Sequence, residues 1–207
     1  MTIDLAEPAT QRPEGGKAQR TFDRLAQATL DEICTNGTFT ADRVAARANS
    51  SPATFFNYFP TKEDAVAASF AIALDELMIV TQNGLRIEQL LDDGLEEVCR
   101  EFTGRCIAYF REYALIFRLA LTLLPAHKTI RDAFRYRQAT AVDHYLRVID
   151  LGQKSGHIRQ GDPIVMADAL LVMTQGLNNP MLIARTDQAV ETELAQTLFR
   201  HLAPPAD

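Results

Sequence analysis

Apolar side chains recur every three or four residues along most of this chain, which is the period of an α-helix. The first such stretch starts near Lys17, and Gly37 follows it as a helix stop. We find no pattern typical of a β-strand and no internal repeat. The sequence therefore predicts an all-α fold of about nine helices, near residues 17–36, 41–48, 52–58, 62–80, 95–113, 116–121, 130–148, 163–178 and 190–202.

Two of these helices are short and carry their own start and stop signals, between Thr40 and Lys62. Ser51 is a typical N-cap and Pro52 suits the first helical position. Pro60 disfavours helical geometry at the residue before it, and Thr61 can cap the next helix. A helix, a tight turn and a short capped helix indicate a helix-turn-helix, whose second helix can enter a DNA major groove.

The same segment resembles the N-terminal DNA-binding domain of the tetracycline-repressor (TetR) family of bacterial transcriptional regulators. The resemblance is most specific over residues 51–65, SPATFFNYFPTKEDA, and extends over about 17–70. There the chain follows the family's order of serine, small residue, threonine, aromatic pair, asparagine, tyrosine, phenylalanine and then lysine-glutamate. It departs from the family where Asn49 replaces a turn glycine, Ser50 a valine, and Phe56 a frequent tyrosine.

The resemblance implies a division into three parts. Residues 1–16, with Pro and Gly among polar residues, are expected to form a flexible arm. Residues 17–62 correspond to the helix-turn-helix DNA-binding domain, and residues 63–207 to a helical domain that binds an effector and dimerises. In this family the last two long helices usually pair with those of a second copy, which implicates about 163–178 and 190–202. Periodicity alone leaves open that these faces are intramolecular core.

The helix at 52–58 has two distinct sides. Phe55 and Phe59 are four residues apart, so we expect them to pack on the two preceding helices. The other side presents small, apolar, amide and hydroxyl groups that suit base edges and phosphate oxygens. Arg43 is the long cation among the groove-facing candidates and is predicted to contact a guanine. The resemblance implies DNA contacts by Thr40, Arg43, Ser51, Pro52, Ala53, Thr54, Phe56, Asn57, Tyr58 and Lys62.

A two-turn helix reads few bases, so two copies reading a palindrome explain why such a protein dimerises. The resemblance implies a repressor that a small hydrophobic or aromatic ligand releases from its operator. Four aromatic residues could line its pocket with four polar ones as handles, although an aromatic stripe at helical spacing is more often plain core. The candidates are Phe102, Arg105, Tyr109, Tyr113, Phe117, Arg118, His144 and Asn178.

Composition changes this interpretation little. The chain has 207 residues, 47% of them hydrophobic, and a net charge of −6. Residues 17–62 hold six basic and four acidic side chains (6 − 4 = +2), so the remainder carries −8. A basic end on an acidic body is compatible with nucleic-acid contact. The three cysteines and four histidines show no metal or disulfide spacing, and the N-terminus lacks the features of a signal peptide, so we expect a cytoplasmic protein without cofactor, metal or membrane partner.

Two other readings compete with a repressor. An enzyme is disfavoured because the sequence lacks a phosphate loop, a nucleophile elbow, a dinucleotide fingerprint and a zinc motif. An all-helical adaptor that binds another protein would also account for the helices. It would not explain why hydroxyl groups and a cation are predicted to be exposed together at Thr54, Tyr58 and Lys62. A regulator that activates transcription remains as an alternative to one that represses it.

Overall fold

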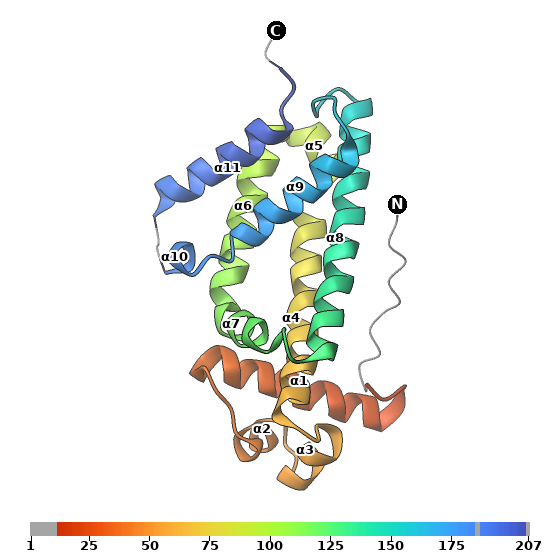
Figure 1. Cartoon of the computed structure of the whole chain (residues 1–207), viewed down its shortest axis with the longest axis vertical. Coiled ribbons are helices and arrows are strands. Elements are labelled where there is room, and N and C mark those ends of the chain that lie inside the picture. Colours follow the sequence, from red (N-terminus) through yellow and green to blue (C-terminus); the bar gives the residue numbers. More distant parts are fainter. Residues whose placement is uncertain (1–11, 185–186, 206–207) are drawn as a thin grey trace. The chain divides into compact units, whose positions relative to one another are not determined.

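The fold is all-α, as predicted. The structure is a computed structural model that describes residues 12–184 and 187–205, and no strand occurs in that part of the chain. The predicted arm at 1–16 lies largely outside the described residues. The helices are α1 (Gly16–Asn36), α2 (Ala41–Arg47), α3 (Pro52–Tyr58), α4 (Lys62–Gly84), α5 (Ile87–Asp93), α6 (Leu95–Glu112), α7 (Ala114–Leu123), α8 (Lys128–Lys154), α9 (Pro163–Gly176), α10 (Pro180–Ile183) and α11 (Gln188–Leu202) (Figure 1).

Nine of these helices match the predicted ones, and α5 and α10 are additional. Both are short, so neither repeats its apolar positions often enough to stand out as periodic. Pro180 starts α10 after α9 has ended at Gly176, and the Met181 N–H donates to Asn179 Oδ1 at 2.9 Å. None of the helices in the described residues has the length and apolar character needed to cross a bilayer.

The chain forms two compact units. Among the described residues, the N-terminal unit contains those up to Glu76 and Tyr113–Tyr136, and the C-terminal unit contains Leu77–Glu112 and those from Arg137 onward. The predicted functional boundary after residue 62 therefore falls inside the N-terminal unit. The difference arises because α7 and the start of α8 pack with the N-terminal helices although they are remote in sequence.

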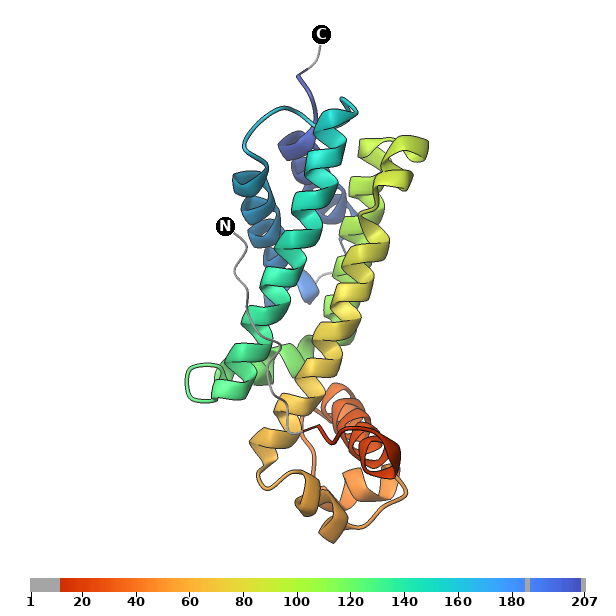
Figure 2. The same ribbon diagram turned by 90° about the vertical axis from the view of Figure 1, so that its right-hand side faces the viewer.

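In the N-terminal unit, α1 supports α2 and α3, which lie next to each other in both ribbon views (Figures 1 and 2). The buried residues in the first half of α4 are mostly alanine and serine. Ser69 Oγ lies 3.0 Å from the Ala26 carbonyl of α1 and 2.7 Å from the Ala65 carbonyl of its own helix. This buried hydroxyl thus joins α4 to α1.

An aromatic group explains why α7 and the start of α8 belong to the same unit. Phe70 of α4 is fully buried. Its ring lies edge-on to Phe117 of α7 at 5.2 Å and stacks with Phe134 of α8 at 6.2 Å between centroids. Such pairs contribute about 0.5–1.5 kcal/mol each beyond their buried area.

In the C-terminal unit, α11 packs along α6 (Figure 1). Glu191 of α11 pairs with Arg111 of α6 at 2.7 Å, and Gln196 donates to Glu96 at 2.8 Å. Tyr145 of α8 is buried, and its hydroxyl donates to Thr174 Oγ1 of α9 at 3.3 Å. These contacts tie α11 to α6, and the second half of α8 to α9.

Candidate nucleic-acid interface and internal cavity

Helix α3 begins and ends as its sequence predicts. Thr54 N–H donates to Ser51 Oγ at 3.1 Å, so Ser51 is the N-cap, and Pro52 occupies the first helical turn. Phe59 leaves the helix with extended backbone geometry directly before Pro60. The helix is therefore a rigid two-turn segment whose length is set by residues at its own ends.

The turn between α2 and α3 depends on Asn49. Its φ of 48° makes it the non-glycine residue with left-handed geometry in the described part of the chain. Asparagine adopts this conformation more readily than most residues, which confirms that it can replace the family's glycine. The Ser50 N–H donates to the Ala45 carbonyl at 2.8 Å and closes the turn without the usual valine.

Aromatic side chains fix the inner side of α3. Phe55 and Phe59 are buried, as predicted, and their ring centroids are 5.4 Å apart. Phe59 lies 5.1 Å from Phe22 of α1, and Phe55 lies 6.3 Å from Phe39, which precedes α2. The orientation of α3 on the other two helices is therefore set by a closely packed aromatic core.

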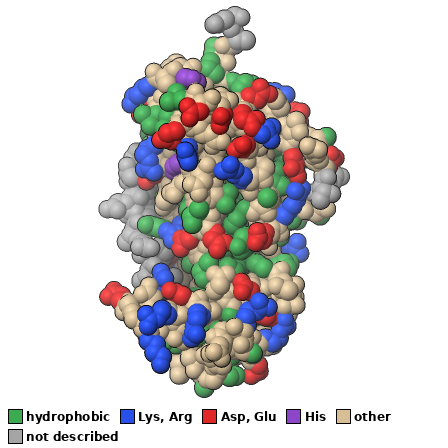
Figure 3. All heavy atoms as spheres, turned by 180° about the vertical axis from the view of Figure 1, so that it is seen from behind, with side chains coloured by type: hydrophobic (Ala, Val, Ile, Leu, Met, Phe, Trp, Pro, Cys, Tyr) green, Lys and Arg blue, Asp and Glu red, His purple; other side chains and the backbone are tan. Residues whose placement is uncertain are grey.

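The ten predicted DNA contacts all remain accessible. Thr54 and Tyr58 are half-buried and the other eight are exposed, with Phe56 50% exposed although it adjoins the buried Phe55. The exposed residues of α1 add cations to this unit, namely Lys17, Arg20 and Arg24. Figure 3 shows several Lys and Arg side chains on the face of the N-terminal unit that it presents. Helix α3 itself contains no acidic residue.

Lys62 lies at the start of α4, where a capping box orders the backbone. Thr61 Oγ1 accepts from the Asp64 N–H at 3.1 Å, and Asp64 Oδ2 accepts from the Thr61 N–H at 3.0 Å. The Lys62 ammonium lies 5.9 Å from the centre of the Phe39 ring, within the range of a cation–π contact. This contact holds an exposed cation beside the helix-turn-helix.

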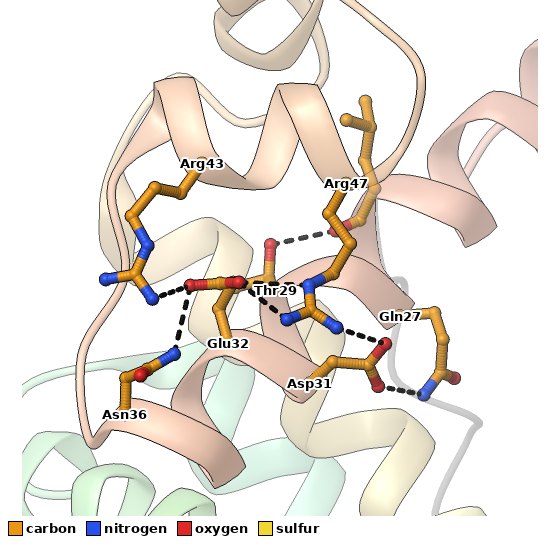
Figure 4. A network of polar contacts seen from close by, with 8 residues as sticks. Gln27, Thr29, Asp31, Glu32, Asn36, Arg43 and Arg47 are labelled. Atoms are coloured by element: carbon orange, nitrogen blue, oxygen red, sulfur yellow. Dashed lines mark hydrogen bonds and ion pairs between the residues drawn. The ribbon is translucent and has the colours of Figure 1, made fainter.

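A buried acid occupies the interface between α1 and α2. Glu32 is only 4% exposed, and Arg47 of α2 contacts its Oε1 through Nε at 2.9 Å and Nη2 at 2.8 Å. Its Oε2 pairs with Arg43 Nη2 and accepts from Asn36 Nδ2 at 3.3 Å (Figure 4). Arg43, the predicted guanine contact, thus has a partner within the protein, while its side chain stays 46% exposed.

Sequence reasoning counted Glu32 only as one of four acids and overlooked its position. The residue follows Leu25 by seven positions and Thr29 by three, so it falls on the apolar stripe of α1. An acid on a core stripe indicates a buried ion pair. That signal was available, but its partners on α2 could be found only from the fold.

The C-terminal unit contains a cavity of about 190 Å³ between α6, α9 and α11. Apolar side chains and threonine hydroxyls form its wall. It is lined by Phe102, Thr103, Met173, Thr174, Gly176, Leu177, Leu194, Thr197 and Leu198. Of the eight predicted ligand-binding residues, Phe102 alone belongs to this wall.

The other predicted ligand residues divide between the two units. Tyr113, Phe117 and Arg118 lie in the N-terminal unit, and Phe117 packs on Phe70 in its core. Arg105, Tyr109, His144 and Asn178 belong to the C-terminal unit. Tyr109 is buried in the core, in agreement with the alternative that the aromatic stripe is plain core and no pocket wall. Arg105 pairs with Glu101 at 2.9 Å on the surface.

His144 has a defined structural partner. Its Nε2 lies 2.9 Å from the Leu85 carbonyl oxygen. Burial lowers the pKa of His144, the hydrogen bond to Leu85 opposes this, and the charge of Arg147 adds to the lowering. Burial thus favours the neutral imidazole, which joins α8 to the residue that follows α4.

A three-helix unit with a capped, outward-facing α3 and an all-helical remainder define the fold of a helix-turn-helix regulator. Solved structures identify it more closely as the fold of TetR-family transcriptional regulators. A regulator of this family from Rhodococcus sp. aligns with a TM-score of 0.67 at 18% identity, over 89% of this chain and 99% of that one. One from Haloarcula marismortui aligns with a TM-score of 0.68 at 19% identity, over 87% and 95%.

A third similar structure is Thermus thermophilus FadR, a TetR-family repressor in complex with lauroyl-CoA. Its TM-score is 0.55 at 20% identity, over 86% of this chain and 93% of that one. The sequence itself matches no protein-family model and no curated protein. The likeness therefore concerns the fold, and the three similar proteins are regulators rather than enzymes.

Proposed function

We propose that this protein is a TetR-family transcriptional regulator that binds DNA through α3 and has no catalytic role. The observation that carries the proposal is the two-sided nature of α3. Phe55 and Phe59 are buried, while the residues on the other side stay accessible. A short rigid helix raised on an aromatic core is the geometry that a major groove accepts.

The accessible residues have distinct proposed roles. Thr54 and Tyr58 donate hydroxyls to phosphates and set the register, with Thr40, Ser51 and Lys62 adding further backbone contacts. Asn57 reads an adenine edge, and the small or apolar Pro52, Ala53 and Phe56 touch thymine methyl groups. Arg43 contacts a guanine through the donors that Glu32 leaves available.

We propose that two copies bind a palindromic operator. Two α3 helices about 34–36 Å apart would read successive major grooves on one side of the duplex. Helices α9 and α11 form the proposed dimer interface. Support comes from α9, whose Ile164, Val165 and Val172 are exposed, with Val172 68% exposed. Such an apolar face on one helix is typical of a protein–protein contact.

In this proposal, a small hydrophobic or aromatic ligand controls whether the protein binds its operator. The cavity beside Phe102 and Leu198 has room for a small apolar molecule, and Thr103 and Thr197 can offer it hydroxyl groups. A ligand that prefers the conformation unable to bind the operator lowers DNA affinity, and DNA lowers ligand affinity by the same factor. We expect a change of about 5–150-fold.

Selection of bound fragments from random double-stranded DNA tests the function. We expect a palindrome whose half-sites are one helical turn apart. Recovery of no enriched sequence, with binding to protein partners instead, would favour the helical adaptor. Placing the selected site upstream of a reporter gene then distinguishes repression from activation, because the two predict opposite changes in transcript level.

Variants of the interface test the assigned roles. Tyr58→Phe and Lys62→Ala should weaken binding to all sequences, and Lys62→Ala should reduce the salt dependence by about one ion. Arg43→Ala should instead relax the preference at one base position. A uniform loss of affinity for Arg43→Ala contradicts base reading by this residue.

A further inference from the structure

The buried carboxylate of Glu32 and the two arginines of α2 form one structural group. Each carboxylate oxygen has two donor groups, which are Nε and Nη2 of Arg47 on Oε1, and Nη2 of Arg43 with Nδ2 of Asn36 on Oε2. Figure 4 shows Glu32 between the two guanidinium groups, which approach it from opposite sides. A buried charge is tolerated when its lone pairs are satisfied in this way.

The two arginines differ in how many donors they spend within the protein. Arg47 uses Nε and Nη2 on Glu32, and its Nη1 lies 3.7 Å from Asp31. Arg43 is held through Nη2, which leaves Nε and Nη1 as donors on a side chain that is 46% exposed. Arg47 therefore anchors the carboxylate, and Arg43 is held in place yet presented outward.

We propose that Glu32 is a positioning residue for DNA recognition, which holds Arg43 in one conformation before DNA arrives. This inference rests on the proposed function and adds a residue that has no contact with DNA itself. A long arginine side chain loses conformational freedom when it binds a base. Because Glu32 orders Arg43 on folding, that entropic cost is not incurred again on binding.

The proposal also explains why the carboxylate lies on the core side of α1. Placed there, Glu32 cannot approach the phosphates, and its charge is already neutralised by two guanidinium groups. Glu32 and the two guanidinium groups together carry one positive charge (2 − 1 = +1), and the carboxylate of Asp31 lies 3.7 Å from Arg47. An exposed acid in the same role would repel the DNA backbone.

Glu32→Gln tests the inference, with Asp31→Asn as its matched control. Both substitutions remove one negative charge from neighbouring positions of α1, but Asp31 is 40% exposed and touches Arg47 only loosely. The measured quantity is the ratio of affinities for the selected duplex and a scrambled one. We expect Glu32→Gln to lower this ratio by about three- to tenfold, and Asp31→Asn to leave it unchanged while raising both affinities.

A double-mutant cycle separates positioning from general stability. If Glu32 acts through Arg43, Glu32→Gln should lower the ratio no further in an Arg43→Ala background. Equal losses in both backgrounds would overturn the inference, as would an unchanged ratio in a folded Glu32→Gln protein. A wild-type protein that selects no DNA sequence overturns the proposed function, and this inference with it.

Glu32→Asp keeps the test valid if Glu32→Gln does not fold. It retains the buried charge, but its shorter side chain cannot hold both guanidinium groups, so the ratio should fall as for Glu32→Gln. A ratio equal to that of the wild type would show that charge neutralisation alone matters, and would refute positioning.

Discussion

Phe55 and Phe56 are adjacent phenylalanines, and we expect replacing one to affect stability and replacing the other to affect DNA binding. Phe55 has no exposed surface and lies within 6.3 Å of the rings of Phe39, Phe56 and Phe59. Phe56 is 50% exposed, and it lies about 100° around the helix from Phe55. Replacing each by alanine therefore separates the packing of the helix-turn-helix from its surface chemistry.

The expected magnitudes differ severalfold. Truncating a buried phenylalanine costs about 3–5 kcal/mol, because it removes buried surface and leaves a cavity. Phe56 buries only half of its surface, so its loss should cost about 1 kcal/mol. Since a domain is stable by about 5–15 kcal/mol, Phe55→Ala removes a large part of that margin and Phe56→Ala a small one.

Urea unfolding followed by far-UV circular dichroism measures the first effect, which is suitable because the chain contains no tryptophan. Gel shifts on the selected duplex, at a temperature where both variants are folded, measure the second. We expect Phe56→Ala to lose about five- to tenfold in affinity, as for a lost thymine contact. Equal destabilisation by the two substitutions, or full DNA affinity in Phe56→Ala, would refute the assignment of the two sides.

Three further predictions concern other parts of the chain. Ser51→Ala removes the N-cap of α3 and should lower the unfolding free energy by about 1 kcal/mol in urea titrations; no change would mean that the cap is dispensable. Burial lowers the pKa of His144 below the unfolded value of about 6.5. Between these two pKa values the unfolded state binds more protons than the folded state, so stability should fall as the pH drops through this window. His144→Gln should reduce that fall, and an unaltered pH profile would contradict it. Burial raises the pKa of the Cys99 and Cys106 thiols to about 12, so a thiol reagent at about pH 8 should label the half-buried Cys34 first and these two only after unfolding; rapid labelling of all three in the folded protein would be inconsistent with this core.

Local features of the site could be predicted because their causes lie within a few residues. The caps at Ser51 and Thr61, the stop before Pro60 and the left-handed Asn49 each depend on neighbouring backbone groups. The inward direction of Phe55 and Phe59 follows from their spacing of four. The fold class and the accessible side of α3 were therefore predictable from the sequence.

The ligand-binding candidates show where such reasoning ends. Periodicity placed the aromatic residues of α6 on one stripe, but it could not tell a cavity wall from a filled core. Phe102 lines the cavity, while Tyr109, seven residues further along the same helix, is buried core. The difference depends on how α9 and α11 fill the space beside α6, and no pattern within α6 contains that information.

The sequence by itself determined nine of the helices, the two ends of α3 and the side of α3 that faces away from the core, because hydrogen bonds and helical periodicity act over short separations. The tertiary structure decided which remote segments share a core. It placed α7 and the start of α8 with the N-terminal helices through Phe70, and it joined Glu32 to two arginines on another helix. These pairings depend on the relative orientation of whole helices, which is settled by the packing of many side chains at once.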